Sequence, residues 1–206
     1  MKILFQGDSI TDVLRRGDDE NYIGMGYPLL VKGVLGYEHP GEHTFFNRGV
    51  SGNRVVDVYA RIKKDILNLK PDVISILLGV NDVWHEVMTP PNGVDADKFF
   101  KVYSMLIEEI LAELPETKII ILEPFVLKAC NTEANWSYFE TEVAKRAEMA
   151  KKVAEKYSLS FVPLQKGFDE LAEKAPNDYW LLDGVHPSTM GHEFIKREWL
   201  KAFEAL

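Results

Sequence analysis

The chain has 206 residues with 24 Lys and Arg against 32 Asp and Glu, and this formal net charge of −8 argues against nucleic-acid or anionic-membrane partners. Hydrophobic residues make up 46%, enough for a substantial core, and no apolar run approaches the roughly 18 residues of a membrane span. The apolar stretch at residues 3–5 is too short for a signal peptide, and the single Cys130 cannot form an internal disulfide. We therefore expect a cytoplasmic protein.

Five short apolar runs are predicted as β-strands, and they alternate with helical patterns. The strands are expected at residues 2–6, 43–47, 72–78, 118–122 and 160–164. Helices are expected at residues 27–37, 54–69, 95–114, 136–157 and 165–174. Ser188 or Thr189 is expected to cap a final helix that runs to about residue 205.

This alternation predicts β-α-β units and an α/β fold, a three-layer α/β/α sandwich around a central parallel sheet. One domain over residues 1–206 is expected, and its size is compatible with a homo-oligomer. Ligands of such sheets bind at the carboxyl ends of the strands. The loops at residues 12–24, 84–96 and 124–136 are expected to frame that site.

Ser9 is the first candidate for chemistry. It follows the first strand in the motif Gly7-Asp8-Ser9-Ile10, where Gly7 permits a tight turn and the next turn leaves backbone N–H groups free. A serine placed there can present its hydroxyl as a nucleophile and its own N–H to an oxyanion. Taken alone, Gly-Asp-Ser is more commonly an ordinary turn or helix cap, because these residue types dominate turns.

Asp183 and His186 form a second candidate pair near the C-terminus, in Asp183-Gly184-Val185-His186-Pro187. Their short, bent spacing lets the carboxylate reach Nδ1–H of the imidazole while Nε2 points outward as a base. Pro187 favours an extended backbone at His186. An isolated Asp-x-x-His is also compatible with a structural loop, so the pair gains weight from Ser9 at the other end of the chain.

Gly52 and Asn81 are candidate oxyanion donors. Gly52 can bring its N–H close to a substrate because it has no side chain, and Asn81 can offer its side-chain NH₂ from the end of the third strand. Both also fit turns, in Ser51-Gly52-Asn53 and in Val80-Asn81-Asp82.

Together the motifs resemble the four sequence blocks of the SGNH hydrolases, the GDSL-type lipase and esterase superfamily. The resemblance implies a flavodoxin-like fold and a Ser-His-Asp esterase with no metal or cofactor. It implies Ser9 as the nucleophile, His186 as the base and Asp183 as the group that orients His186. The Ser9 N–H, the Gly52 N–H and the Asn81 side chain would hold the oxyanion. The Gly-x-Ser-x-Gly elbow of the other common serine esterase fold is absent.

Longer strings around the first three blocks look closest to bacterial acetylxylan esterases. This implies a short-chain esterase that removes acetyl groups from carbohydrate such as xylo-oligosaccharides. Two alternatives stay open: a lysophospholipase or thioesterase of the same superfamily, and a non-catalytic carbohydrate-binding protein on the same scaffold.

Four further residues have competing interpretations. Trp84 could wall an acyl or sugar pocket or be a packed core aromatic. Ser51, also in a Gly-rich turn, is a weaker rival for the nucleophile. His192 is interpreted as structural or surface. Glu123, at a strand end, could touch the site, but capping a loop is the favoured interpretation. No spacing of the histidines fits a metal site.

Overall fold

The computed structural model describes residues 1–206 and contains a five-stranded parallel sheet in the order β2-β1-β3-β4-β5. The strands are β1 (Lys2–Gly7), β2 (Thr44–Asn47), β3 (Val73–Leu77), β4 (Lys118–Leu122) and β5 (Ser160–Val162). All five predicted strands are present, with ends that shift by one or two residues. The α/β prediction is confirmed.

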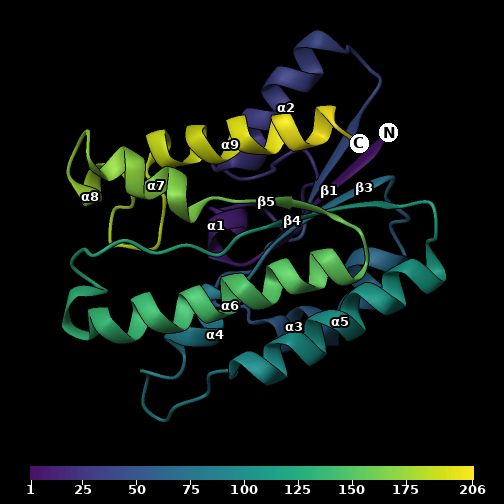
Figure 1. The fold of residues 1–206 in the computed structure, drawn as a ribbon. Helices are drawn as coiled ribbons and strands as arrows, with labels where there is room; N and C mark the ends of the chain where they lie inside the picture. Colours follow the sequence, from purple (N-terminus) through teal and green to yellow (C-terminus); the bar gives the residue numbers. More distant parts are fainter.

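Helices cover both faces of the sheet (Figure 1). One face carries α2 (Tyr27–Glu38), α7 (Gln165–Ala172) and α9 (Thr189–Glu204), and the other carries α3 (Val55–Ala60), α4 (Val80–Trp84), α5 (Ala96–Glu113) and α6 (Trp136–Lys156). The remaining short elements are α1 (Ser9–Asp12), η1 (Lys63–Leu67), η2 (Glu133–Asn135) and α8 (Asn177–Trp180).

The strands read as continuous apolar runs because successive side chains enter two different cores. In β1, Ile3 and Phe5 belong to a cluster that includes residues of α2 and α9. Leu4, between them, belongs to a second cluster with residues of α3 and α5. This period-2 alternation, with burial on both sides, is typical of a parallel sheet covered by helices.

The helix predicted at residues 54–69 is wrong as one continuous element. α3 ends at Ala60, Arg61 leaves the helical path, and the wider π-turn η1 follows. The Arg61 guanidinium donates to Asn53 Oδ1 at 2.8 Å and to Gln6 Oε1 at 2.9 Å. Apolar spacing does not detect the break, because the segment stays buried on either side of it.

Three single-turn α-helices, α1, α4 and α8, lie in segments for which no helix is predicted. Each is four or five residues long, too short to show a helical period in the sequence. The last helix begins as expected, since Ser188 Oγ accepts a hydrogen bond from Gly191 N at 3.2 Å.

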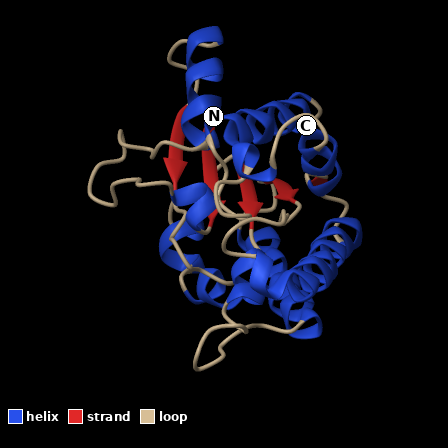
Figure 2. Cartoon of the chain, turned by 90° about the vertical axis from the view of Figure 1, so that its left-hand side faces the viewer, coloured by secondary structure: helices blue, strands red, loops and turns tan.

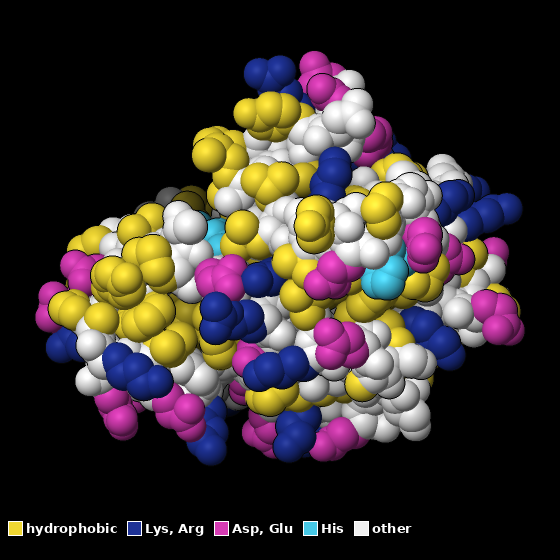
Figure 3. Space-filling view, turned by 90° about the horizontal axis from the view of Figure 1, so that it is seen from above, with side chains coloured by type: hydrophobic (Ala, Val, Ile, Leu, Met, Phe, Trp, Pro, Cys, Tyr) yellow, Lys and Arg dark blue, Asp and Glu magenta, His cyan; other side chains and the backbone are white.

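The face seen in Figure 3 mixes acidic, basic and apolar side chains over its whole area. No extended basic patch lies on this face. None of the helices is both long and apolar enough to cross a membrane.

Candidate active site

The site lies at the carboxyl edge of the sheet, which faces the viewer in Figure 2. Ser9 is the first residue of α1, directly after β1, and Asn81 lies in α4, directly after β3. β1 and β3 are neighbours, with Gly7 opposite Leu77. Asp183 and His186 lie in the turn between α8 and α9. Parallel strands that end at one edge thus bring these segments together.

Three predicted residues form a continuous hydrogen-bonded chain. Ser9 Oγ lies 2.9 Å from His186 Nε2, and His186 Nδ1 lies 2.7 Å from Asp183 Oδ2. Ser9 and His186 are 177 positions apart in the sequence. The His186 side chain is 44% exposed, so this hydrogen-bonded series of side chains is accessible to solvent.

The Asp183–His186 turn is organised by its own backbone. Asp183 Oδ1 accepts from Val185 N at 2.9 Å and from His186 N at 2.8 Å. Gly184 has φ +98°, and a Cβ there would lie 2.5 Å from the Leu127 carbonyl oxygen. Only glycine fits this position, and the resulting bend leaves Asp183 Oδ2 free to face the imidazole.

Asn131 adds a contact that the sequence interpretation missed. Its Nδ2 donates to Asp183 Oδ2 at 3.1 Å, and its backbone N donates to Asp183 O at 3.2 Å. Asn131 lies in the loop that leads to η2, with no sequence signal that links it to Asp183. The expected 124–136 loop therefore does border the site.

The charges of the pair stabilise one another. The hydrogen bond that its ring donates to Asp183 raises the pKa of His186 above its ordinary value, although partial burial opposes this. Burial alone would raise the pKa of Asp183, but hydrogen bonds from the His186 ring, His186 N and Val185 N hold it well below its usual range. Asp183 is therefore an anion beside an imidazole that can become cationic.

Gly52 and Asn81 lie on the two segments that flank Ser9. Gly52 has φ +80°, and Val50 N donates to Gly7 O at 3.1 Å, which holds this turn against the end of β1. Asn81 Nδ2 is buried and has no hydrogen-bond partner in the protein. A buried donor without a partner is costly, and an incoming oxyanion would satisfy it.

Two buried carboxylates underlie this region. Asp8 and Asp82 each have 0% exposure. The Asp82 carboxylate accepts from Val55 N at 3.1 Å and so connects α4 to the start of α3, just after the Gly52 turn. The sequence interpretation assigned neither residue a role, although both lie inside the quoted motifs.

The hydrogen bonds of the other candidate residues distinguish between their competing interpretations. Ser51 Oγ donates to Asp12 Oδ2 at 2.8 Å. His192 is buried, and its Nδ1 accepts from Tyr27 N at 3.1 Å, which confirms a structural position. Glu123 Oε2 accepts from the first backbone N–H groups around α7, which confirms its capping interpretation.

Trp84 ends α4 and packs against Phe139, with ring centroids 5.3 Å apart. This contact favours the packed-aromatic interpretation. A role in the wall of a substrate pocket stays a prediction.

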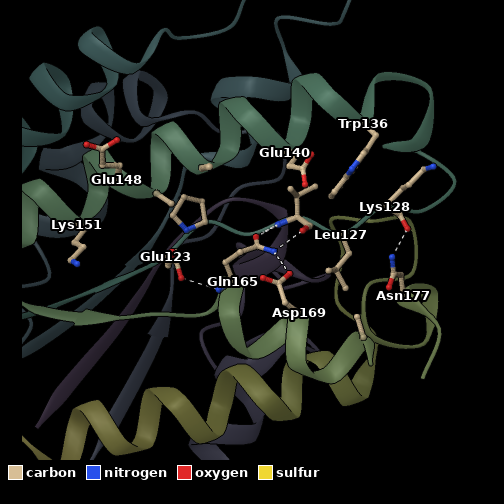
Figure 4. Close-up of a pocket in the computed structure, with 15 residues that line it drawn as sticks. Glu123, Leu127, Lys128, Trp136, Glu140, Glu148, Lys151, Gln165, Asp169 and Asn177 are labelled. Carbon is tan, nitrogen blue, oxygen red and sulfur yellow. Dashed lines mark hydrogen bonds between the residues drawn. The ribbon is translucent and has the colours of Figure 1, made fainter. Parts of the chain in front are cut away.

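A cavity of about 650 Å³ lies away from these residues, between α6 and α7 (Figure 4). None of the side chains in the Ser9–His186–Asp183 chain lines it. Gln165 crosses its floor and bonds to both backbone groups of Val126. On the opposite side of this segment, Leu127 N donates to Gly184 O at 2.9 Å. The segment thus separates the cavity from the Asp183 turn.

The fold and the site combine a parallel-sheet α/β sandwich with a serine, a histidine and an aspartate in hydrogen-bonded series. Residues 5–194 match the GDSL-like Lipase/Acylhydrolase family, and the chain belongs to this family of carboxylic ester hydrolases. The chain is 32% identical to an acetylxylan esterase from Geobacillus stearothermophilus, over 97% of this chain and 92% of that protein.

Two solved structures of esterases or lipases of this type are similar to the chain over nearly its whole length. A GDSL-like lipase from Parabacteroides merdae is 34% identical with a TM-score of 0.90, covering 98% of this chain and 94% of that one. The acetylxylan esterase Axe2 from Geobacillus stearothermophilus is 31% identical with a TM-score of 0.86, covering 98% and 93%. The predicted family and its sandwich fold are confirmed.

Proposed function

We propose that the protein is a serine esterase that acts through an acyl-enzyme on Ser9. The observation that carries this proposal is the hydrogen-bonded series from Ser9 Oγ through the His186 ring to Asp183 Oδ2. A base within hydrogen-bond reach of a hydroxyl, itself oriented by a carboxylate, is the arrangement that activates serine as a nucleophile.

The geometry supports the following sequence of steps. Ser9 Oγ attacks the ester carbonyl while His186 Nε2 takes the hydroxyl proton, and Asp183 stabilises the imidazolium. The Ser9 N–H, the Gly52 N–H and the Asn81 side chain bind the negative carbonyl oxygen. His186 then returns the proton to the departing alcohol. Water repeats the attack on the acyl-enzyme, giving the free acid and regenerating Ser9.

We further propose that the substrate is a short acyl ester, most simply acetyl, on a carbohydrate such as a xylo-oligosaccharide. Similar structures support this: Axe2 is described as an acetylxylan esterase and as an acetyl-xylooligosaccharide esterase. Its catalytic mutants replace a serine, an aspartate and a histidine, the latter two spaced as Asp183 and His186 are here. In a cytoplasmic protein, imported oligosaccharides would be the available form of such a substrate.

Hydrolysis of p-nitrophenyl acetate by wild type, Ser9→Ala and Ser51→Ala tests the proposal. Ser51 is the matched control, because it lies in the same region but bonds to Asp12 instead of a histidine. We expect Ser9→Ala to lower kcat by about 10⁴-fold or more and Ser51→Ala to leave it within about threefold. Equal rates for wild type and folded Ser9→Ala would refute the assignment.

Acyl-chain length separates the alternatives within the superfamily. A steep fall in kcat/KM from acetate to octanoate esters supports the acetyl esterase. A maximum at eight or more carbons would instead identify a lysophospholipase or thioesterase. Tight binding of xylo-oligosaccharide without turnover of any ester would indicate the non-catalytic binding protein.

A further inference from the structure

Asp8 lies between the end of β1 and Ser9, and it is wholly buried. Its Oδ1 accepts a hydrogen bond from Ile10 N at 2.9 Å, as the N-cap of α1. This bond fixes the orientation of the carboxylate. Its other oxygen, Oδ2, has no hydrogen-bond partner in the protein.

Capping alone does not account for a buried carboxylate at this position. Ser and Asn cap helices as well as Asp does, without the cost of removing a charge from water. Burial raises the pKa of Asp8 to about 7, against the opposing effects of Ile10 N–H, His186 and Asn81. The unpartnered oxygen therefore requires a second explanation.

The neighbouring segment offers a complementary group. Asn81 follows β3, the strand paired with β1, and its Nδ2 is also buried and unpartnered. The Asn81 amide lowers the pKa of Asp8 and so favours the ionised carboxylate, against the larger opposing effect of burial. An NH₂ group has two hydrogens, so one can face Asp8 while the other faces the oxyanion.

We propose that Asp8 is a positioning residue whose Oδ2 orients the Asn81 amide, so that one N–H stays directed at the oxyanion. This inference rests on the proposed function, because it assigns Asp8 to the oxyanion hole of that reaction.

A double-mutant cycle on p-nitrophenyl acetate tests the proposal, with Asp8→Asn, Asn81→Ala and the combined variant. Asn at position 8 keeps an oxygen for Ile10 N but turns an NH₂ toward the Asn81 NH₂. We expect Asn81→Ala to lower kcat by about 100-fold and Asp8→Asn by about 10-fold, each with KM nearly unchanged. In the Asn81→Ala background, Asp8→Asn should cost less than about twofold.

Asp95→Asn is the matched control, because Asp95 caps α5 in the same way, accepting from Lys98 N at 2.9 Å, but unlike Asp8 it is exposed. If Asp8→Asn does not fold, Asp8→Ser takes its place in the cycle, since it keeps a cap but removes the oxygen that faces Asn81. Additive losses in the cycle, or a loss confined to KM, would overturn the proposal. Failure of the esterase itself shows separately, as a wild type no faster than Ser9→Ala.

Discussion

Replacing Asp183 by Asn tests how the carboxylate controls the imidazole. Asp183 Oδ1 accepts two backbone N–H bonds, and an Asn oxygen can keep both, so the turn should persist. The Asn NH₂ then takes the place of Oδ2, which now faces His186 Nδ1 at 2.7 Å. A donor at that distance requires Nδ1 to be the acceptor and moves the ring proton to Nε2.

With its proton on Nε2, His186 can no longer accept the Ser9 proton. Substitutions of this kind in serine triads lower kcat by about 10⁴-fold, which corresponds to about 5 kcal/mol of barrier. The Asn NH₂ would also face Asn131 Nδ2, which now donates to Oδ2 at 3.1 Å. Loss of bonds to a charged group should lower the free energy of unfolding by about 1.5–3 kcal/mol.

The assay is kcat on p-nitrophenyl acetate, with thermal unfolding measured for each protein. Asp178→Asn is the control, because Asp178 is exposed on α8 and the chemical change is the same. We expect wild-type kcat for the control and a folded but nearly inactive Asp183→Asn. A folded Asp183→Asn within about tenfold of wild type would refute the assignment of Asp183 as the orienting group.

Two pH dependences follow from the histidines. Because the Asp183 hydrogen bond raises the pKa of His186 and only the neutral ring is a base, kcat/KM should rise with pH about a midpoint above 6.5; a midpoint below 6.5 would contradict this. Burial first, and then the charge of His186, lower the pKa of His192 to about 4. In the unfolded chain the His192 ring binds a proton with a pKa near 6.5, whereas in the folded protein it stays neutral down to about pH 4. The free energy of unfolding should therefore fall by about 3 kcal/mol from pH 6.5 to 4. The free energy of unfolding of His192→Gln, measured in urea, should lack this fall between pH 6.5 and 4. A pH dependence equal to that of wild type would contradict the prediction.

Much of the architecture could be predicted because its signals are local. The run at 72–78 is apolar at every buried position of β3 except Ser75, and its neighbours Pro71 and Gly79 mark its limits. The Asp-Gly-x-His turn is likewise local, since Gly184 and the backbone bonds of Asp183 determine its shape. Such features depend on residues a few positions apart, which a single sequence displays.

Other features left no local signal. The break at Arg61 depends on Asn53 and Gln6, and the second partner is 55 positions away. Asn131 meets Asp183 across 52 positions. The short helix α4 carries too few residues for a period, yet it determines where Asn81 lies. Each of these features depends on which segments of the chain pack together, and the secondary-structure propensity of the residues does not specify that packing.

The sequence by itself determined the strands, the order of the motifs and the residue types needed for ester hydrolysis, because each strand and each motif is a short contiguous stretch of the chain. Only the tertiary structure decided that Ser9 meets His186 across 177 positions and that Ser51 does not. It also decided that Asp8 is wholly buried, with one carboxylate oxygen left without a hydrogen-bond partner. The physical reason is that hydrogen bonds and burial depend on distance in space, which the packing of the sheet edge establishes.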